Sequence, residues 1–277
     1  KMLQADDNAL EPAMERILKT VKESDVTVLV VGENPQHVGE GKDKSNLNLT
    51  PAHLELAKLV HSAGKPVATV LLNGRPLTVN WLAENAPAII EAWFPGEKGG
   101  TAVADVLFGD VNPSGKLPIT IPKSVGQLPV FYNHKESGRR GYVDGDSNPL
   151  YPFGHGLSYT TFEYSNLKIN PAIISVDGKA TVSVDIKNSG KVAGTEVVQL
   201  YINDKFSSVV TPVIELKGFD RVDLKPGEVK TVSMELNEEH LSLWNAEIKD
   251  VVEPGTFEVM VGSSSKDIRL MGEFEVK

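Results

Sequence analysis

The chain has 277 residues, of which 40% are hydrophobic and 23% charged, values that suit two folded domains with ordinary cores. A formal net charge of −9 gives no electrostatic reason to expect nucleic acid or an anionic membrane surface as a partner. The chain has no cysteine, which excludes disulfides and thiolate chemistry, and no apolar stretch approaches the roughly 18 residues of a membrane span.

The chain begins with a helix pattern and then an apolar strand. Apolar residues between positions 8 and 24 recur at helical spacing. The runs 25–31 and 66–73 are almost entirely apolar and rich in β-branched residues, which predicts strands buried on both faces. Between them, Thr50-Pro51 favours a helix start and Gly64 a helix end.

The same alternation continues with a short helix over 76–85, a strand over 86–94, a helix over 97–110 and a last short strand over 116–122. Such alternation predicts right-handed βαβ units and a parallel sheet. Three or four strands are fewer than the roughly five or six that a sheet usually contains. We therefore expect an α/β sandwich domain over residues 1–135 that is incomplete at its N-terminus.

The pattern changes after a connecting arm, residues 136–158, that is rich in Gly, Asn, Pro and Asp. From residue 159 to 277, short segments alternate apolar with polar residues and are separated by turn signals. This spacing predicts an all-β antiparallel sandwich. Without a Cys–Trp–Cys pattern, a fibronectin III-like sandwich is favoured over a true immunoglobulin domain.

The loop GENPQHVGEGKDKSN, residues 32–46, follows the first strand and carries several titratable side chains. Ligands of parallel sheets bind beyond the carboxyl ends of the strands, so its position marks a candidate site. Glycines flank Glu40 and give its backbone freedom. Three interpretations stay open: a solvated acidic loop, a mobile acid that reaches over a substrate, and a metal site formed by Glu33, His37 and Glu40, whose spacing matches no specific ligand pattern.

Other motifs are less informative. Neither GxGxxG nor GxxxxGK[ST] follows any strand, and no serine sits in a GxSxG elbow. The connecting arm carries aromatics and the pair Arg139 and Arg140. It could be a linker that packs on both domains or an arm that lines a sugar-binding cleft.

Three long segments strongly resemble glycoside hydrolase family 3, the β-glucosidase and β-xylosidase family. They are NGRPL (73–77), EAWFPGEKGGTAVADVLFGDVNPSGKLPITIPKSVGQLPVFYN (91–133) and PLYPFGHGLSYTTF (149–162). The resemblance covers nearly the whole chain. It implies a (β/α)8 barrel, an α/β sandwich domain and a fibronectin III-like domain in that order, with the active site between the first two.

In this family the barrel supplies an aspartate nucleophile and the α/β domain supplies a glutamate general acid/base on a loop. The matching residue is Glu40, in HVGEGKDKSNLNL, while Glu33 fits less well. Relatives carry a polar or charged pair where Asp43 and Lys44 stand, which we interpret as shaping the loop. The candidates for substrate binding or loop shaping are His37, Asp43, Lys44, Arg139 and Arg140.

A retaining glycosidase needs a second carboxyl about 5–5.5 Å from the first. In the family this aspartate follows a serine and precedes an aromatic at a strand end. Only Ser24-Asp25 stands near a strand, and it precedes that strand and is followed by Val26. We therefore expect the nucleophile outside this chain, on a barrel in the same precursor or in a second chain, and no activity without it.

The resemblance thus implies part of a retaining exo-acting β-glycosidase that hydrolyses terminal non-reducing β-D-glucosyl residues, without a cofactor or a metal. A β-xylosidase is an alternative, and a non-catalytic carbohydrate-binding or scaffolding module is another. Expected partners are β-linked gluco- or xylo-oligosaccharides or aryl glycosides, together with the barrel, and neither nucleic acid nor a membrane. We expect a soluble protein; its compartment stays open between the cytoplasm and the periplasm or exterior.

Overall fold

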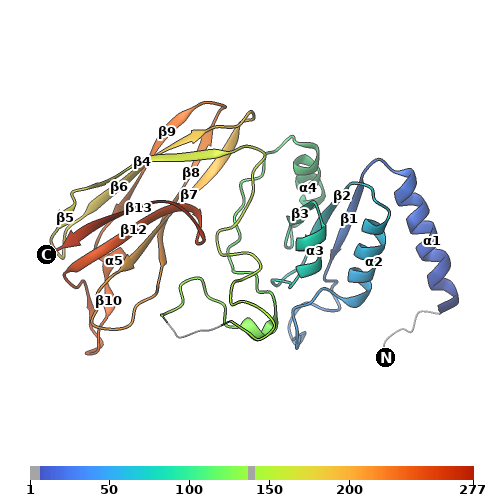
Figure 1. Cartoon of the computed structure of the whole chain (residues 1–277), viewed down its shortest axis with the longest axis horizontal. Coiled ribbons are helices and arrows are strands. Elements are labelled where there is room, and N and C mark those ends of the chain that lie inside the picture. Colours follow the sequence, from blue (N-terminus) through green and yellow to red (C-terminus); the bar gives the residue numbers. More distant parts are fainter. Residues whose placement is uncertain (1–6, 137–140) are drawn as a thin grey trace. The chain divides into compact units, whose positions relative to one another are not determined.

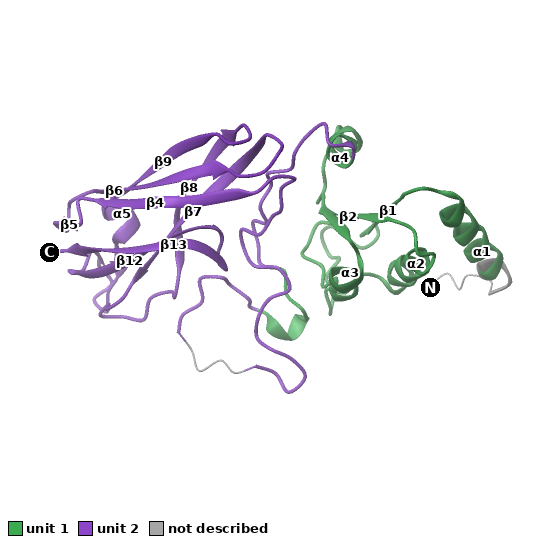
Figure 2. Ribbon diagram, turned by 45° about the horizontal axis from the view of Figure 1, so that its top comes forward, with its two compact units in different colours: residues 1–107, 121–128 green, residues 108–120, 129–277 purple. Residues whose placement is uncertain are grey.

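The computed structural model describes residues 7–136 and 141–277, and contacts divide the chain into two compact units (Figures 1 and 2). Unit 1 comprises residues 1–107 and 121–128, and unit 2 comprises residues 108–120 and 129–277. Arg139 and Arg140 lie outside the described residues, so the structure says nothing of their expected role.

Unit 1 is an α/β unit whose three strands form a parallel sheet in the order β1-β2-β3. The strands are β1 (Thr27–Gly32), β2 (Val67–Leu72) and β3 (Ala88–Glu91). The helices are α1 (Asp7–Glu23), α2 (Pro51–Ser62), α3 (Asn80–Asn85) and α4 (Gly99–Phe108), with a 3-10 turn at Val125–Gln127. The βαβ alternation predicted from sequence is confirmed.

The ends of the helices follow the sequence signals in part. Pro51 opens α2, where its missing N–H costs no hydrogen bond. Thr50 precedes it, but its side chain makes no capping hydrogen bond. Gly64 follows the helix with a φ of 71°, as expected of a glycine terminator. The helix expected over 76–85 begins only at Asn80.

The register of β1 and β2 brings their carboxyl ends to one edge of the sheet, because Gly32 pairs with Leu72. Gly32 has a φ of 146°, and a Cβ there would collide with the carbonyl oxygen of Leu72. That same carbonyl accepts a hydrogen bond of 2.8 Å from the backbone N–H of Glu33. The loop after β1 therefore starts directly beside the end of β2.

Two strand expectations were wrong. In β1, Leu29 and Val31 are buried, but Val28 and Val30 are 49% and 53% exposed. β1 lies at the edge of the sheet, and within the described chain the face that carries Val28 and Val30 is only partly covered. Residues 116–122 form no strand: Pro118 and Pro122 lack a backbone N–H, and Leu117 forms its backbone hydrogen bonds with Gly154 and His155.

Unit 2 is a β sandwich, as predicted. One sheet has the order β5-β13-β12-β7-β8, a second has the order β4-β6-β9, and β10 pairs with β11. The strands are β4 (Phe162–Asn170), β5 (Ile173–Ile174), β6 (Ala180–Asn188), β7 (Gly194–Asp204), β8 (Glu215–Leu224), β9 (Val229–Leu236), β10 (Leu243–Trp244), β11 (Asp250–Val251), β12 (Gly255–Ser264) and β13 (Asp267–Val276). A short helix, α5 (Glu238–Leu241), precedes β10.

The core of unit 2 follows the period of two that a strand imposes on its side chains. In β6, Val182, Val184 and Ile186 are buried while the residues between them are less so. They belong to one buried cluster with Val198 and Leu200 of β7. Alternating apolar residues from both sheets thus form the core of the sandwich.

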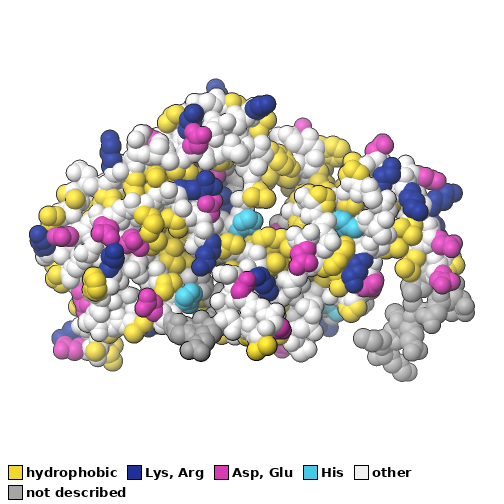
Figure 3. All heavy atoms as spheres, in the orientation of Figure 1, with side chains coloured by type: hydrophobic (Ala, Val, Ile, Leu, Met, Phe, Trp, Pro, Cys, Tyr) yellow, Lys and Arg dark blue, Asp and Glu magenta, His cyan; other side chains and the backbone are white. Residues whose placement is uncertain are grey.

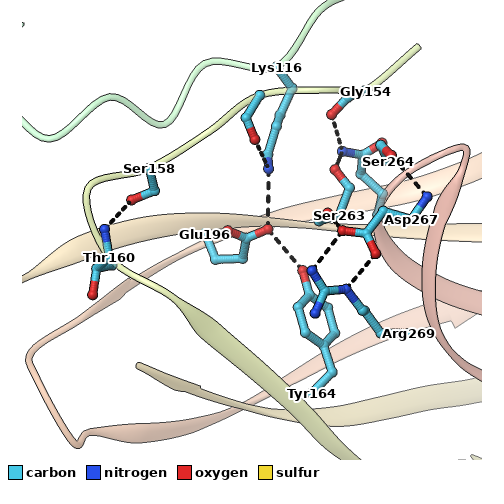
Figure 4. Close-up of polar contacts among 12 residues, drawn as sticks. Lys116, Gly154, Ser158, Thr160, Tyr164, Glu196, Ser263, Ser264, Asp267 and Arg269 are labelled. Carbon is cyan, nitrogen blue, oxygen red and sulfur yellow. Dashed lines mark hydrogen bonds and ion pairs between the residues drawn. The ribbon is translucent and has the colours of Figure 1, made fainter. Parts of the chain in front are cut away.

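A buried ion pair joins the segment 108–120 to the sandwich within unit 2 (Figure 4). The Lys116 Nζ lies 3.3 Å from Glu196 Oε1 and donates to the carbonyl of Gly156. The hydroxyl of Tyr164 donates to the same Glu196 oxygen at 2.9 Å. Only 5% of the Glu196 side chain is exposed, so these partners replace the water that its charge has lost.

The side chains around this pair have altered pKa values. Burial, and then the charge of Glu196, raise the pKa of Tyr164 far above its ordinary value, so its hydroxyl remains a donor. Burial alone would raise the pKa of Asp267, but hydrogen bonds from Arg269 and Ser263 lower it below its ordinary value. The cluster is therefore satisfied with Tyr164 neutral and Asp267 ionised.

Charged side chains of both signs are interspersed on the face drawn in Figure 3. Within the described residues, none of the helices has the length and apolar character needed to cross a membrane.

Candidate active site

The loop that follows β1 carries Glu40 on the surface of unit 1. Gly39 and Gly41 on either side have φ values of 121° and 69°, conformations that other residues adopt rarely. Space is not the reason for glycine here, because an added Cβ would meet nothing within 4 Å at either position. The backbone turn itself requires glycine, and this turn presents Glu40 to solvent.

Glu33, at the start of the loop, has a different environment. Only 1% of its side chain is exposed, and two cations pair with it. The Nε of Arg75 lies 3.2 Å from Oε2, and the Nζ of Lys44 lies 3.6 Å from Oε1. A carboxylate enclosed in this way fixes its partners and is not available to a substrate.

Arg75 reaches from the segment after β2 to both sides of Glu40. Its Nη2 donates to the carbonyl of His37 at 2.9 Å and to the carbonyl of Lys42 at 3.2 Å. One guanidinium group therefore binds the buried Glu33 and two loop carbonyls at once. We call Glu33, Arg75 and these two carbonyls the loop clamp.

The remaining loop candidates lie around this clamp. The His37 side chain is exposed, as is Asp43. The Lys44 side chain is 20% exposed and donates to the carbonyl of Asn48 at 3.2 Å as well as pairing with Glu33. This geometry places Lys44 across the base of the loop; the roles expected of Lys44, His37 and Asp43 remain predictions.

A pocket of about 760 Å³ borders the loop. Its lining includes Asp43 and Lys44 from the loop, Glu55 of α2, and Asn80 and Trp81 of α3. Polar groups that converge beside an aromatic side chain are usual in small-molecule sites. The Glu40 side chain is not part of this lining, so the pocket lies beside the candidate acid/base rather than under it.

Two residues at the same edge of the sheet were missed by sequence reasoning. Asn73, fully buried after β2, donates to the carbonyl of Arg75 at 2.9 Å and to Glu91 Oε2 at 3.3 Å. Glu91 ends β3 and also accepts from the Trp93 N–H. Burial raises the pKa of Glu91, while these two hydrogen bonds act in the opposite direction. Polar residues at the carboxyl ends of neighbouring strands were the available signal.

The second carboxyl of a retaining site is not supplied by Asp25. This residue precedes β1, whereas the loop leaves the opposite end of that strand. Six residues of strand separate the two ends, or about 20 Å at 3.3 Å per residue.

The described residues, 7–136 and 141–277, hold no group of three His, Cys, Asp or Glu side chains placed to bind a metal ion.

The family models match this arrangement of domains. Residues 3–159 match the glycosyl hydrolase family 3 C-terminal domain, and residues 196–265 match the fibronectin type III-like domain. An α/β unit followed by a β sandwich is thus the C-terminal architecture of a class of glycoside hydrolases. The chain belongs to glycosyl hydrolase family 3, which confirms the resemblance found in the sequence.

Named relatives include both expected activities. The chain is 48% identical to a β-xylosidase of Formosa agariphila, covering 94% of this chain and 36% of the relative. It is 42% identical to a periplasmic β-glucosidase of Salmonella typhimurium, covering 99% and 37%. The chain thus spans little more than a third of the length of these relatives.

Solved structures agree with the fold. The β-glucosidase from Listeria innocua in complex with glucose superposes with a TM-score of 0.92 at 41% identity, covering 96% of this chain and 38% of that one. The β-glucosidase from Kluyveromyces marxianus has a TM-score of 0.83 at 38% identity, covering 99% and 35%.

Proposed function

We propose that this chain is the part of a retaining, exo-acting β-glycosidase that supplies the general acid/base, Glu40. The observation that carries the proposal is the contrast within one loop. Glu33 is enclosed by two cations, whereas Glu40 is exposed between two positive-φ glycines and pairs with no cation among the residues that the structure describes. The site is completed by a (β/α)8 barrel that carries an aspartate nucleophile.

In the first step, the Glu40 carboxylic acid gives its proton to the glycosidic oxygen while the aspartate attacks the anomeric carbon. The bond to the leaving group breaks and a glycosyl-enzyme forms. In the second step, the Glu40 carboxylate takes a proton from water as that water attacks the anomeric carbon and releases the aspartate. The configuration at this carbon is retained.

A carboxylic acid stays protonated near neutral pH only where burial or a neighbouring negative charge favours its neutral form. Glu40 is exposed in this chain, so both influences come, in this proposal, from the docked barrel and its substrate. The chain alone is then inactive.

The substrate is a terminal non-reducing β-D-glucoside. Support comes from the names of relatives, since the Listeria β-glucosidase was solved with glucose and a mutant of it with laminaribiose. The β-xylosidase of Formosa agariphila, at 48% identity, supports a β-xyloside as the second candidate.

The acid/base assignment is tested by Glu40→Gln in the complete protein with its barrel. We expect kcat/KM to fall by about 10²–10⁴-fold for cellobiose, whose leaving group needs protonation. The loss should be far smaller for a dinitrophenyl glucoside, whose leaving group departs without help. Added azide should then yield β-glucosyl azide, because the second step lacks its base.

A matched control is Glu97→Gln, which changes an exposed glutamate of unit 1 outside the loop. It should leave both substrates unaffected. Equal losses on both substrates in the Glu40 variant, without azide rescue, would remove Glu40 from the proposed role.

A further inference from the structure

Arg75 has a geometry that a simple ion pair does not require. Its side chain is only 22% exposed, and it uses Nε for Glu33 and Nη2 for two backbone carbonyls. A planar fork of several donors can make these bonds together, whereas the compact ammonium of lysine cannot reach them in the same geometry.

The two carbonyls lie three residues before and two residues after Glu40 in the chain. The loop is therefore fixed on both sides of a residue whose own neighbours are conformationally free glycines. Without the clamp, the positive-φ turn at Gly39 and Gly41 would have many alternative conformations.

The other end of the clamp is rigid. Glu33 directly follows Gly32, whose pairing with Leu72 is fixed by the register of two parallel strands. Asn73 holds the carbonyl of Arg75 itself, and it is fully buried. The clamp thus connects the edge of the sheet to the loop.

We propose that Arg75 is the positioning residue of the acid/base loop: anchored on buried Glu33, it holds the backbone on both sides of Glu40. The inference rests on the proposed function of Glu40. Arg75 itself touches no reacting atom in this scheme; it acts through the position of Glu40, where a misplacement of about 1 Å can cost 10²-fold in rate.

The first test measures the loop itself. In the complete protein, Arg75→Met should raise amide hydrogen exchange in residues 34–44, because local opening of the loop becomes easier. Arg75→Lys should give an intermediate increase. Arg221→Met is the matched control, since Arg221 is exposed and donates to the Ser114 hydroxyl of unit 2. Unchanged exchange in the loop of Arg75→Met would overturn the proposal.

The second test measures catalysis over a series of aryl glucosides. Arg75→Met should lower kcat/KM by about 10–100-fold for phenyl glucoside and much less for dinitrophenyl glucoside. In a double variant with Glu40→Gln, Arg75→Met should cause little further loss of kcat/KM on phenyl glucoside, because both changes impair the same proton transfer. A uniform loss across the series, or fully additive losses in the double variant, would contradict a positioning role.

The two tests separate the two proposals. If Glu40 is not the acid/base, the loss of kcat/KM caused by Glu40→Gln will not depend on the leaving group. If Glu40 is the acid/base but Arg75 does not position it, Glu40→Gln keeps that dependence while Arg75→Met leaves both hydrogen exchange and the aryl series unaltered.

Discussion

Glu33 in unit 1 and Glu196 in unit 2 are both buried carboxylates, with side chains that are 1% and 5% exposed, respectively. Each pairs with a basic side chain that also binds a backbone carbonyl. The two basic side chains hold different parts of the chain. Lys116 fastens the 108–120 segment to a packed sandwich, whereas Arg75 holds a solvent-exposed loop that carries Glu40. The same local chemistry therefore serves a scaffold in one unit and a candidate site in the other.

The largest effect is expected where the cation that pairs with Glu196 is removed. Lys116→Met leaves this carboxylate buried, with the Tyr164 hydroxyl as its remaining hydrogen-bond donor among the described residues and the charge of Arg269 nearby. Unfolding of unit 2 should therefore become easier, by up to about 3–5 kcal/mol. Chemical denaturation followed by a probe in unit 2 measures this. Hydrogen exchange in the unit 1 loop should not change.

The double variant Lys116→Met/Glu196→Gln is the control for the buried charge. Glutamine keeps an oxygen for the Tyr164 hydroxyl and removes the charge, so most of the lost stability should return. A double variant as unstable as Lys116→Met would mean that packing of the lysine stem, and not the ion pair, carries the effect.

A smaller effect is expected at Gly41. Its φ of 69° is left-handed, so Gly41→Ala should add about 1–2 kcal/mol of local strain. We expect this strain to shift the loop and to lower kcat/KM on phenyl glucoside. Gly109→Ala introduces the same kind of strain, at a φ of 82° and with equally open space, at the end of α4. That control should reduce stability but should not change kcat/KM in a way that depends on the leaving group. Identical kinetics in both variants would count against the importance of the turn.

The smallest effect concerns Glu91. Burial raises its pKa in the folded state, so the folded chain holds this proton more tightly than the unfolded chain does. Its contribution to stability is therefore complete below the unfolded pKa of about 4.3 and falls as pH rises through the raised folded pKa. Relative to Glu91→Gln, the wild-type free energy of unfolding should decrease with rising pH across this range. A difference that stays constant from pH 4 to 8 would contradict the raised pKa.

The sequence predicted those parts of the fold whose signals are local. The apolar runs of β1 and β2 and the alternation in β6 need no distant partner to be recognised. Residues 116–122 look like a strand by composition, yet Leu117 bonds with Gly154 and His155, far along the chain. No local pattern contains that contact.

The site shows the same division. Glu40 could be proposed from its glycine neighbours and its place after a strand, together with the family resemblance. Arg75 could not, because its role depends on the parallel register that brings the end of β2 beside the start of a loop 42 residues away in sequence. The exposure of Val28 and Val30 on β1 was missed for a related reason. Whether these side chains are covered depends on how other elements pack and not on the residue type.

The loop clamp also has an evolutionary consequence. His37 and Lys42 contribute only carbonyl oxygens to Arg75, and every amino acid carries that group. Their side chains can therefore be exchanged during divergence without loosening the hold on Glu40. If Glu40 is the acid/base, as proposed above, such a loop can acquire new preferences for the leaving group while the position of Glu40 is kept.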